Sequence, residues 1–156
     1  MWSFSQKTKD LQTLPSISDP CHRWGIAEGD YDGSPLIVRF NNSGKEWCAH
    51  PGLPIKLGFA VPLNTPTENG LPESVESEQL SDIEDVIVRE VQARTKGLHA
   101  LVLSTSNMKE FVFYIPRRVD VESLHKAVQE AVPTHDVQCM AEKEVKWDSF
   151  TDFSPE

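Results

Sequence analysis

The stretch Leu98–Pro116 constrains the fold more than any other part of the sequence. Two runs rich in branched and aromatic residues flank Ser106-Asn107-Met108-Lys109, and asparagine tolerates the positive φ that a tight turn requires. The pattern predicts a β-hairpin. Because each run is almost entirely apolar, both faces of its strands should be covered, which places the hairpin inside a sheet.

A second hairpin is predicted ahead of this stretch. Trp24–Tyr31 and Leu36–Phe40 flank Asp32-Gly33, a dipeptide suited to the positive φ angles of a two-residue turn. Pro35 has no N–H to donate, so the second strand is expected to pair fully only after it, or to lie partly at an edge. Residues 1–20 predict an irregular N-terminal arm with a few anchoring aromatic and aliphatic side chains.

Hydrophobic periodicity predicts the remaining elements. Leu53–Leu63 alternates with period two, which indicates a strand, and the loop after it offers Asn69-Gly70 as an exposed turn. One helix is expected to end near Gly97, and a second is capped by Asp120 and stopped by Pro133. The apolar stripe of the first helix is Leu80, Ile83, Ile87 and Val91, and that of the second is Val121, Leu124, Val128 and Ala131. A strand is expected next, over His135–Ala141. A helical turn that carries Trp147, Phe150 and Phe153 follows it.

The order from Leu53 onward is therefore β-α-β-β-α-β. It predicts an α+β fold, a ferredoxin-like split β-α-β antiparallel sheet with two helices on one face and an added N-terminal β-hairpin. Residues 21–156 are expected to form this single domain behind the arm of residues 1–20. The face opposite the helices is left to solvent, the N-terminal hairpin, the aromatic tail or a partner.

Charge and composition narrow the classes of partner. The 156 residues include 24 acidic and 15 basic side chains, for a formal charge of −9. Such a field opposes binding to nucleic acid phosphates and anionic lipid, and it favours a basic protein partner. No apolar run approaches the roughly 20 residues that span a bilayer, and the start is not a secretory signal. The three scattered cysteines favour a reducing cytoplasm over a disulfide framework.

The sequence contains no common catalytic, nucleotide-binding or metal-binding motif. Cys21-His22 with Cys48 and His50 has the residue types of a zinc site but not its C-x₂₋₄-C or H-x₃₋₅-H spacing. Cys48 and His50 as nucleophile and base lack a third, orienting group, and the acidic cluster from Glu73 to Asp85 is interpreted as a solvated helix start. The sequence therefore predicts no catalytic, cofactor-binding or metal-binding residues, no cofactor, and more plausibly a protein that is not an enzyme.

The strand Lys109–Ile115 invites comparison with RNA-recognition motifs, whose third strand stacks bases on aromatic rings. Both glycines of that pattern are missing, and Glu110 stands where a basic or small residue is expected. We therefore interpret the strand as core, with Phe111, Phe113 and Ile115 on one face and Val112 and Tyr114 on the other.

These features together resemble a known family. The strand pair Ser104–Tyr114, the capped helix, the short strand and Trp147-x-x-Phe150 are similar to the bacterial domain of unknown function family 695, and Trp2-Ser-Phe4 and Asp32–Asn41 fit its N-terminal half. Two places differ: Asn107-Met108 stands where the family tends to carry glycine, and Glu144-Val-Lys precedes Trp147 in place of Asp-Pro-x. The resemblance implies a fold similar to the regulator of ribonuclease E activity, protein B, a small acidic protein that inhibits a ribonuclease by binding it.

Three functions follow as hypotheses. The first is a cytoplasmic binding or regulatory domain that acts through an unidentified protein partner. The second is a small-molecule-binding or enzymatic domain with a site between the sheet and the N-terminal hairpin, which polar groups such as Asp30, Arg39 or His50 would line. The third, and weakest, is RNA binding through the sheet. The sequence assigns neither a partner surface nor an oligomeric state.

Overall fold

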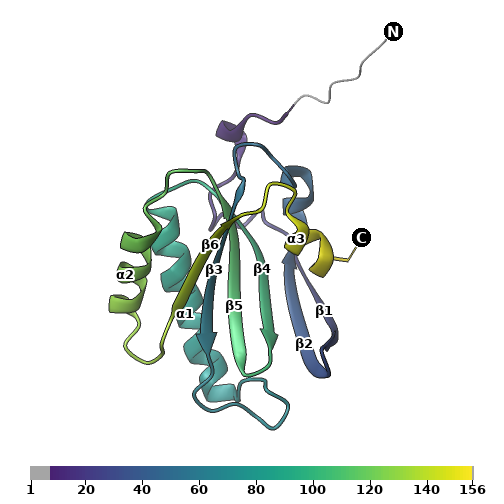
Figure 1. The fold of residues 1–156 in the computed structure, drawn as a ribbon, viewed down its shortest axis with the longest axis vertical. Coiled ribbons are helices and arrows are strands. Elements are labelled where there is room, and N and C mark those ends of the chain that lie inside the picture. Colours follow the sequence, from purple (N-terminus) through teal and green to yellow (C-terminus); the bar gives the residue numbers. More distant parts are fainter. Residues whose placement is uncertain (1–7, 156) are drawn as a thin grey trace.

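The computed structural model describes residues 8–155, which form a six-stranded antiparallel sheet with helices on both faces (Figure 1). The strand order is β1-β2-β4-β5-β3-β6, and the fold is of the α+β class predicted from the sequence. The elements, with η for short 3₁₀ helices, are η1 Leu11–Thr13, β1 Trp24–Tyr31, β2 Ser34–Asn41, η2 Asn42–Trp47, β3 Ile55–Pro62, α1 Ser74–Gln92, β4 Leu98–Thr105, β5 Met108–Ile115, α2 Val121–Ala131, β6 Gln138–Lys143 and α3 Asp148–Phe153.

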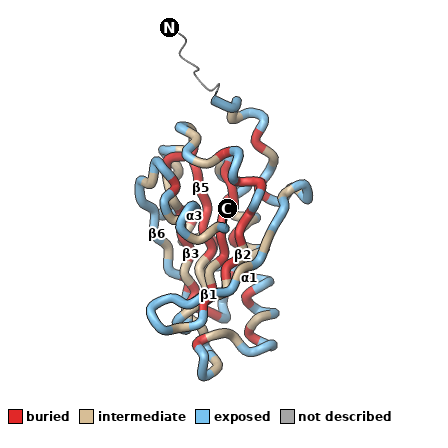
Figure 2. The backbone as a smooth tube through the Cα atoms, turned by 90° about the vertical axis from the view of Figure 1, so that its right-hand side faces the viewer, coloured by how far each residue is buried: buried red, intermediate tan, exposed pale blue. Residues whose placement is uncertain are grey.

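Helices α1 and α2 cover one face of the sheet and enclose the larger of two hydrophobic cores. The predicted strand faces are confirmed: Phe111, Phe113 and Ile115 point into this core, whereas Val112 and Tyr114 point into the other. Both rings of Phe111 and Phe113 are therefore closed in under the helices and cannot present a face to a base. Figure 2 shows the buried residues running along the central strands.

The opposite face is covered over part of its area by aromatic side chains from η2 and α3. Trp47, Trp147 and Phe150 are buried there, and the indole N–H of Trp147 donates to the carbonyl of Leu53 at 2.9 Å. This resolves the question that the sequence left open. The predicted aromatic tail forms the cover, and the N-terminal hairpin does not, because its strand β2 pairs with β4 and continues the sheet sideways.

The N-terminal hairpin has the predicted turn and the predicted effect of proline. Asp32 and Gly33 both have positive φ, 52° and 86°. Strand β2 pairs with β1 from Ser34 onward, but its pairing with β4 begins only at Ile37, two residues after Pro35. The missing N–H therefore falls where no neighbouring strand on that side needs it.

The arm ahead of this hairpin connects the two cores. Leu14 is buried in the core under α3, and Ile17 is buried in the core under α1 and α2. Trp2 and Phe4, which the sequence suggested as further anchors and as part of the family resemblance, lie outside the described residues.

The central hairpin turns over two residues, Ser106 and Asn107, with φ of 53° and 66°. The loop after β3 docks on this turn, because the N–H of Asn107 donates to the carbonyl of Gly70 at 3.0 Å. Gly70 has the expected turn conformation, with φ of 76°, but it is buried. The predicted turn forms and Asn69 is exposed, but the prediction that the whole turn is exposed is wrong at Gly70, since one loop packs on the other.

Helix α1 ends earlier than predicted. Its last residue is Gln92, five positions before Gly97, which therefore does not terminate it. The glycine is needed for packing instead, because a Cβ at position 97 would lie 3.0 Å from the Ile115 side chain and from the carbonyl oxygen of Tyr114. In helix α2 the predicted cap is confirmed, as the Asp120 side chain accepts from the N–H of Ser123. Ala131 is exposed, however, and the buried residue at that end is Val132.

The last strand starts at Gln138, three residues after the predicted start at His135. Before Gln138, side chains of α2 form hydrogen bonds with backbone N–H and C=O groups that would otherwise pair with a neighbouring strand. Gln129 accepts from the N–H of Val137 at 2.8 Å and donates to the carbonyl of His135 at 2.9 Å. His125 Nε2 lies 2.6 Å from the carbonyl oxygen of Val137. The segment is thus bound to a helix before it reaches β3.

Candidate functional site

A cleft lies between helix α1, the N-terminal arm and the strands β1, β2 and β4. Its volume is about 550 Å³. One wall is α1, the floor is the helix-side face of β1, β2 and β4, and residues 17–22 of the arm close the third side. We call it the α1–β2 cleft. Its side chains are Ile17, Ser18, Asp19, Pro20 and His22 from the arm, Trp24, Arg39 and His99 from the sheet, and Ser81, Glu84, Asp85, Val88, Arg89 and Gln92 from α1.

An ion pair across the cleft joins the sheet to the helix. The guanidinium of Arg39 donates from Nη2 to Glu84 Oε2, and its central carbon lies 5.1 Å from the ring centroid of Trp24. This position over the indole face adds a cation–π attraction. Glu84 is also 3.8 Å from Nδ1 of His99, so one carboxylate faces two nitrogen groups of the sheet.

His99 forms the innermost part of the cleft. It is 4% exposed, and its ring stacks on Phe113 with centroids 4.3 Å apart and planes 13° apart. The ring of Trp24 meets it edge-on at 4.9 Å. Burial, then the positive charges of Arg39 and His22, lower the pKa of His99 to about 3. The imidazole is therefore neutral across the physiological range.

Two buried nitrogens in this cleft have no hydrogen-bond partner among the described residues. They are Nε2 of His99 and Nε of Arg39. An unpaired polar atom in a buried position costs about 1–3 kcal/mol, so such atoms are rare in folded proteins and mark this cleft as unusual.

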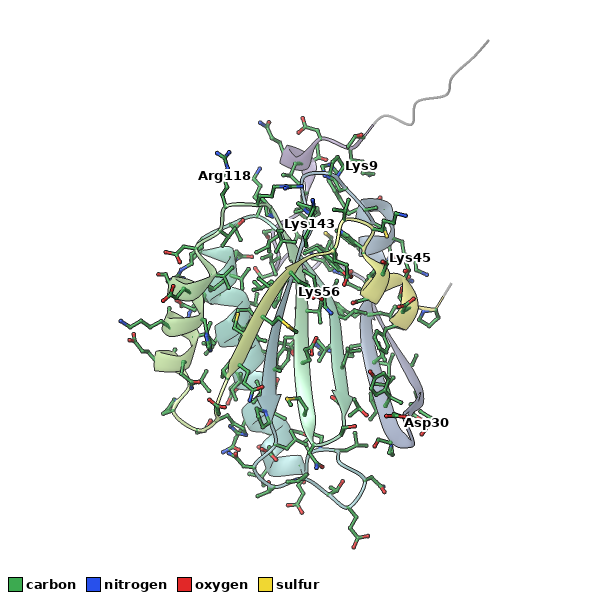
Figure 3. The ribbon with its side chains drawn as sticks, in the orientation of Figure 1. Lys9, Asp30, Lys45, Lys56, Arg118 and Lys143 are labelled. Carbon is green, nitrogen blue, oxygen red and sulfur yellow. The ribbon has the colours of Figure 1, made fainter. Side chains whose placement is uncertain are left out.

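Of the three residues that the sequence suggested for a ligand site, only Arg39 lines this cleft. Asp30 is exposed near the far end of β1 (Figure 3). His50 has both ring nitrogens engaged elsewhere, since Nε2 lies 2.6 Å from the carbonyl oxygen of Lys9 and Nδ1 accepts from Gly52 N–H at 2.8 Å. The cleft also lies between α1 and the hairpin strands rather than between the sheet and the hairpin, because the hairpin is part of the sheet.

The cysteine–histidine combinations do not converge on reactive geometry. Burial, then the charge of Asp148, raise the pKa of the Cys48 thiol, so the thiolate needed of a nucleophile is disfavoured. His22 Nε2 is 2.9 Å from the carbonyl oxygen of Ser16. Within residues 8–155, no group of three or more His, Cys, Asp or Glu side chains is placed to hold a metal ion.

The acidic start of α1 is not uniformly solvated. Glu76 is 2% exposed and accepts hydrogen bonds from the N–H groups of Asn64 and Thr65, at 2.6 and 2.9 Å. Its Oε2 also lies 2.6 Å from Nε2 of His135, which is 4% exposed. The interpretation of the whole cluster as a solvated helix start is wrong at this position, because Glu76 ties the β3–α1 loop to the α2–β6 loop.

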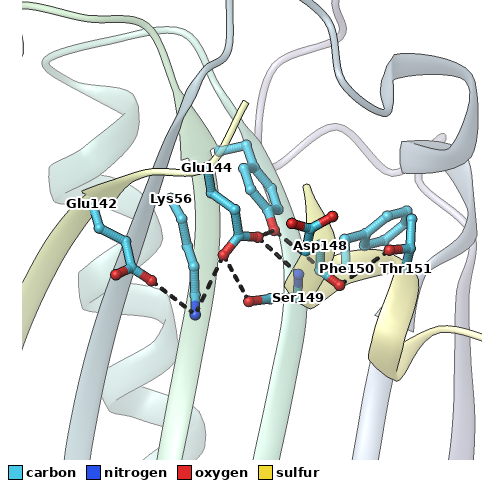
Figure 4. A network of polar contacts seen from close by, with 8 residues as sticks. Lys56, Glu142, Glu144, Asp148, Ser149, Phe150 and Thr151 are labelled. Atoms are coloured by element: carbon cyan, nitrogen blue, oxygen red, sulfur yellow. Dashed lines mark hydrogen bonds and ion pairs between the residues drawn. The ribbon is translucent and has the colours of Figure 1, made fainter. Parts of the chain in front are cut away.

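A second polar network holds the aromatic cover in place (Figure 4). The Tyr114 hydroxyl donates to Glu144 at 2.6 Å, and Ser149 donates to the same carboxylate from both N–H and hydroxyl, at 2.8 and 2.9 Å. Lys56 faces Glu142 at 3.7 Å and Glu144 at 4.0 Å. Burial, then hydrogen bonding to Glu144, raise the pKa of Tyr114 above its ordinary value. The network is structural, since it fixes where α3 begins.

A broader hollow of about 820 Å³ lies beside α2 and β6. Its rim is made largely of exposed charged side chains such as Glu122, Lys126 and Glu130. The ring of His125 and the amide of Gln129, which also line it, are engaged by the backbone of residues 132–137. Because no buried polar atom is left unpaired there, the α1–β2 cleft is the stronger candidate site.

A comparison with known protein families gives a match that covers most of the chain. Residues 22–154 match the family of unknown function DUF695. The chain belongs to this family. No curated protein and no solved structure matched it. The DUF695 match spans all six strands and includes every sheet and helix residue of the α1–β2 cleft, whereas residues 17–20 of the arm lie outside it.

At the two positions where the family is expected to carry other residues, Asn107 and Glu144 meet the local structural requirement. Asn107 has the positive φ that glycine would supply. Glu144 stands where an Asp is expected, and its carboxylate makes the three hydrogen bonds that anchor Tyr114 and Ser149. No helix in the described part of this DUF695 protein is long and apolar enough to cross a membrane.

Proposed function

We propose that this protein is a binding domain that acts through contact with a basic protein partner, recognised by the free edge of β1. The observation that carries the proposal is Ile26, which is 69% exposed in the middle of an edge strand. Trp24 and Tyr31 on the same strand are 38% and 52% exposed. Apolar side chains gathered on one edge are typical of an interaction surface.

The edge of β1 lacks three of the features that prevent strand addition, which are lysine, proline and a bulge. The charged side chains of residues 24–31 are Glu28 and Asp30, which repel acidic segments but not basic ones. Residues 24–31 contain no lysine or proline, and their register with β2 is continuous. The other edge strand, β6, is shorter and ends in Lys143. An extended segment that pairs with β1 would gain main-chain hydrogen bonds along eight residues.

Charge favours a basic segment over other partners. Glu28, Asp30 and Asp32 are exposed along β1 and its turn, and residues 24–33 contain no basic side chain. The net charge of −9 adds to this field. Charge complementarity of this kind raises the association rate and makes binding sensitive to salt.

The proposal includes a ferredoxin-like arrangement for β3 to β6. The order β6-β3-β5-β4, with α1 and α2 on one face, supports it. The likeness in fold to the regulator of ribonuclease E activity, protein B, rests on that arrangement. Because one fold serves many functions, the partner is inferred from the chemistry of β1 and not from this likeness.

The test is affinity capture from a native lysate with three forms of the protein. Ile26→Lys places a charge at the centre of the edge, and Val75→Lys makes the same change at a residue of α1 that is 71% exposed. We expect the wild type and Val75→Lys to retain one and the same basic protein, released by raised salt, and Ile26→Lys to lose it. Equal capture by all three forms, or no specific capture by the wild type, would overturn the proposal.

A further inference from the structure

The α1–β2 cleft provides a second recognition site, which shares Trp24 with the edge of β1. Its innermost polar atoms, Nε2 of His99 and Nε of Arg39, are both buried and unpaired. Glu84 already engages the other side of each group, through Arg39 Nη2 and toward His99 Nδ1. Both groups therefore keep hydrogen-bonding capacity that no described residue uses.

The hydrogen-bonding roles of the two atoms follow from their surroundings. A neutral imidazole carries one proton, and Glu84 favours it on Nδ1, which leaves Nε2 as an acceptor. Arg39 Nε carries a hydrogen in every protonation state and is a donor. The floor of the cleft thus offers one donor and one acceptor. A hydroxyl group both accepts and donates, so it can pair with either atom.

The charges of the cleft indicate a neutral ligand. Arg39 is already balanced by Glu84, so it does not require an anion. The rim carries Asp19 and Asp85 against Arg89, and these carboxylates would repel an anion. A cation would have to compete with Arg39 for Glu84. A molecule without charge is neither repelled by these carboxylates nor required to compete for Glu84.

Size and shape point to a small ring compound with several hydroxyls. The volume of about 550 Å³ lies within the range of small-molecule sites. The partly exposed indole of Trp24 gives an apolar wall for the C–H face of such a ring, while Ser81, Gln92 and Asp85 supply polar groups around it. We propose that the α1–β2 cleft binds a neutral polyhydroxyl compound of monosaccharide size, whose hydroxyls pair with Arg39 Nε and His99 Nε2.

The first experiment uses NMR with glucose, galactose, ribose and myo-inositol as probes. Each probe is added up to about 50 mM, which is enough to detect binding with a dissociation constant of about 1–10 mM. We expect at least one to shift the ring ¹⁵N signal of His99 and the indole N–H of Trp24 in a saturable way, while the ring signals of His125 on α2 stay in place. If none of the four moves the His99 signal, the two nitrogens are satisfied by water alone and the proposal is overturned.

The second experiment separates the two hydrogen bonds from general damage. Arg39→Lys keeps a positive charge for Glu84 but removes the Nε donor, and His99→Phe keeps a ring against Phe113 but removes the acceptor. With the indole N–H of Trp24 as readout, each is expected to weaken binding at least tenfold. Arg117→Lys, at an exposed position outside the cleft, serves as the control and should bind as the wild type does. Unchanged affinity in a folded Arg39→Lys variant would overturn the proposal even if His99→Phe fails to fold.

Discussion

The carboxylate of Glu76 and the imidazole of His135 form a fully buried pair, with Oε2 2.6 Å from Nε2. The two residues are 59 positions apart in the chain, on α1 and on the segment before β6. Three further hydrogen bonds, from the backbone of Asn64 and from both N–H and hydroxyl of Thr65, end on the same carboxylate. Glu76 therefore joins three segments at one end of the domain.

Glu76→Gln should lower the free energy of unfolding by about 3–5 kcal/mol, the range found when one member of a buried pair is lost. The amide nitrogen of glutamine cannot accept, so at least one donor is left unpaired. Urea denaturation measures the change. Glu78→Gln, two residues along the same helix at an exposed position, should stay within about 0.5 kcal/mol of the wild type. Equal effects of the two substitutions would contradict the assignment.

The same pair should make stability depend on pH in one direction. Burial alone would raise the pKa of Glu76, but hydrogen bonds from Asn64, His135 and Thr65 outweigh it and lower the pKa below its ordinary value of 4.5. A carboxylate with a lowered pKa in the folded state contributes stability that is complete above the ordinary value and is lost as pH falls through the lowered one. The gap in unfolding free energy between wild type and Glu76→Gln should therefore narrow below pH 4.5; a constant gap would contradict this.

Local signals in the sequence were sufficient for most of the fold. The turns at Asp32-Gly33 and at Asn107 depend on the φ preferences of those residues, and the cap at Asp120 depends on its own side chain. Alternation over β3 and β5 reports which face each side chain takes. These properties act within a few residues, so a sequence pattern carries them.

The cleft could not be predicted in the same way, because it depends on long-range register. The sequence suggests Arg39 as a polar residue on a strand, but its partner Glu84 lies 45 residues away. His99 lies inside an apolar run, and the pattern of that run predicts only a buried strand. A break in register between His99 and Leu101 determines which face it takes. The one signal that would have found it is a lone histidine within an otherwise apolar strand.

Tyr114→Phe should lower the free energy of unfolding by about 1.5–3 kcal/mol, the range for a hydrogen bond to a charged group. It removes the donor to Glu144, whose pKa these bonds lower against the effect of burial. Thermal unfolding and urea denaturation measure the change. The chain offers a matched control in Tyr31, which is exposed: Tyr31→Phe should be close to neutral. A neutral Tyr114→Phe would show that Ser149 alone fixes α3.

Phe113→Ala should cost about 3–5 kcal/mol, as expected for a large aromatic side chain removed from a core. Its ring packs edge-on against Phe59 at 6.1 Å and supports His99 by stacking. Phe153→Ala, at a half-buried position on α3, should cost clearly less. Unfolding of Phe113→Ala at the wild-type temperature would place this ring outside the core.

The three cysteines should react with iodoacetamide in a fixed order, Cys21 first and Cys139 last. Alkylation requires the thiolate. Burial raises the pKa of Cys139 to about 11, so at about pH 8 only about one part in a thousand is ionised, and the half-buried side chain is also hindered. Cys21 is exposed, although a hydrogen bond to Asp19 raises its pKa as well. Mass spectrometry of timed samples gives the order, and in concentrated urea all three rates should converge. Early labelling of Cys139 in the native protein would mean that β6 detaches from β3, because Cys139 lies opposite Phe59 in that pairing.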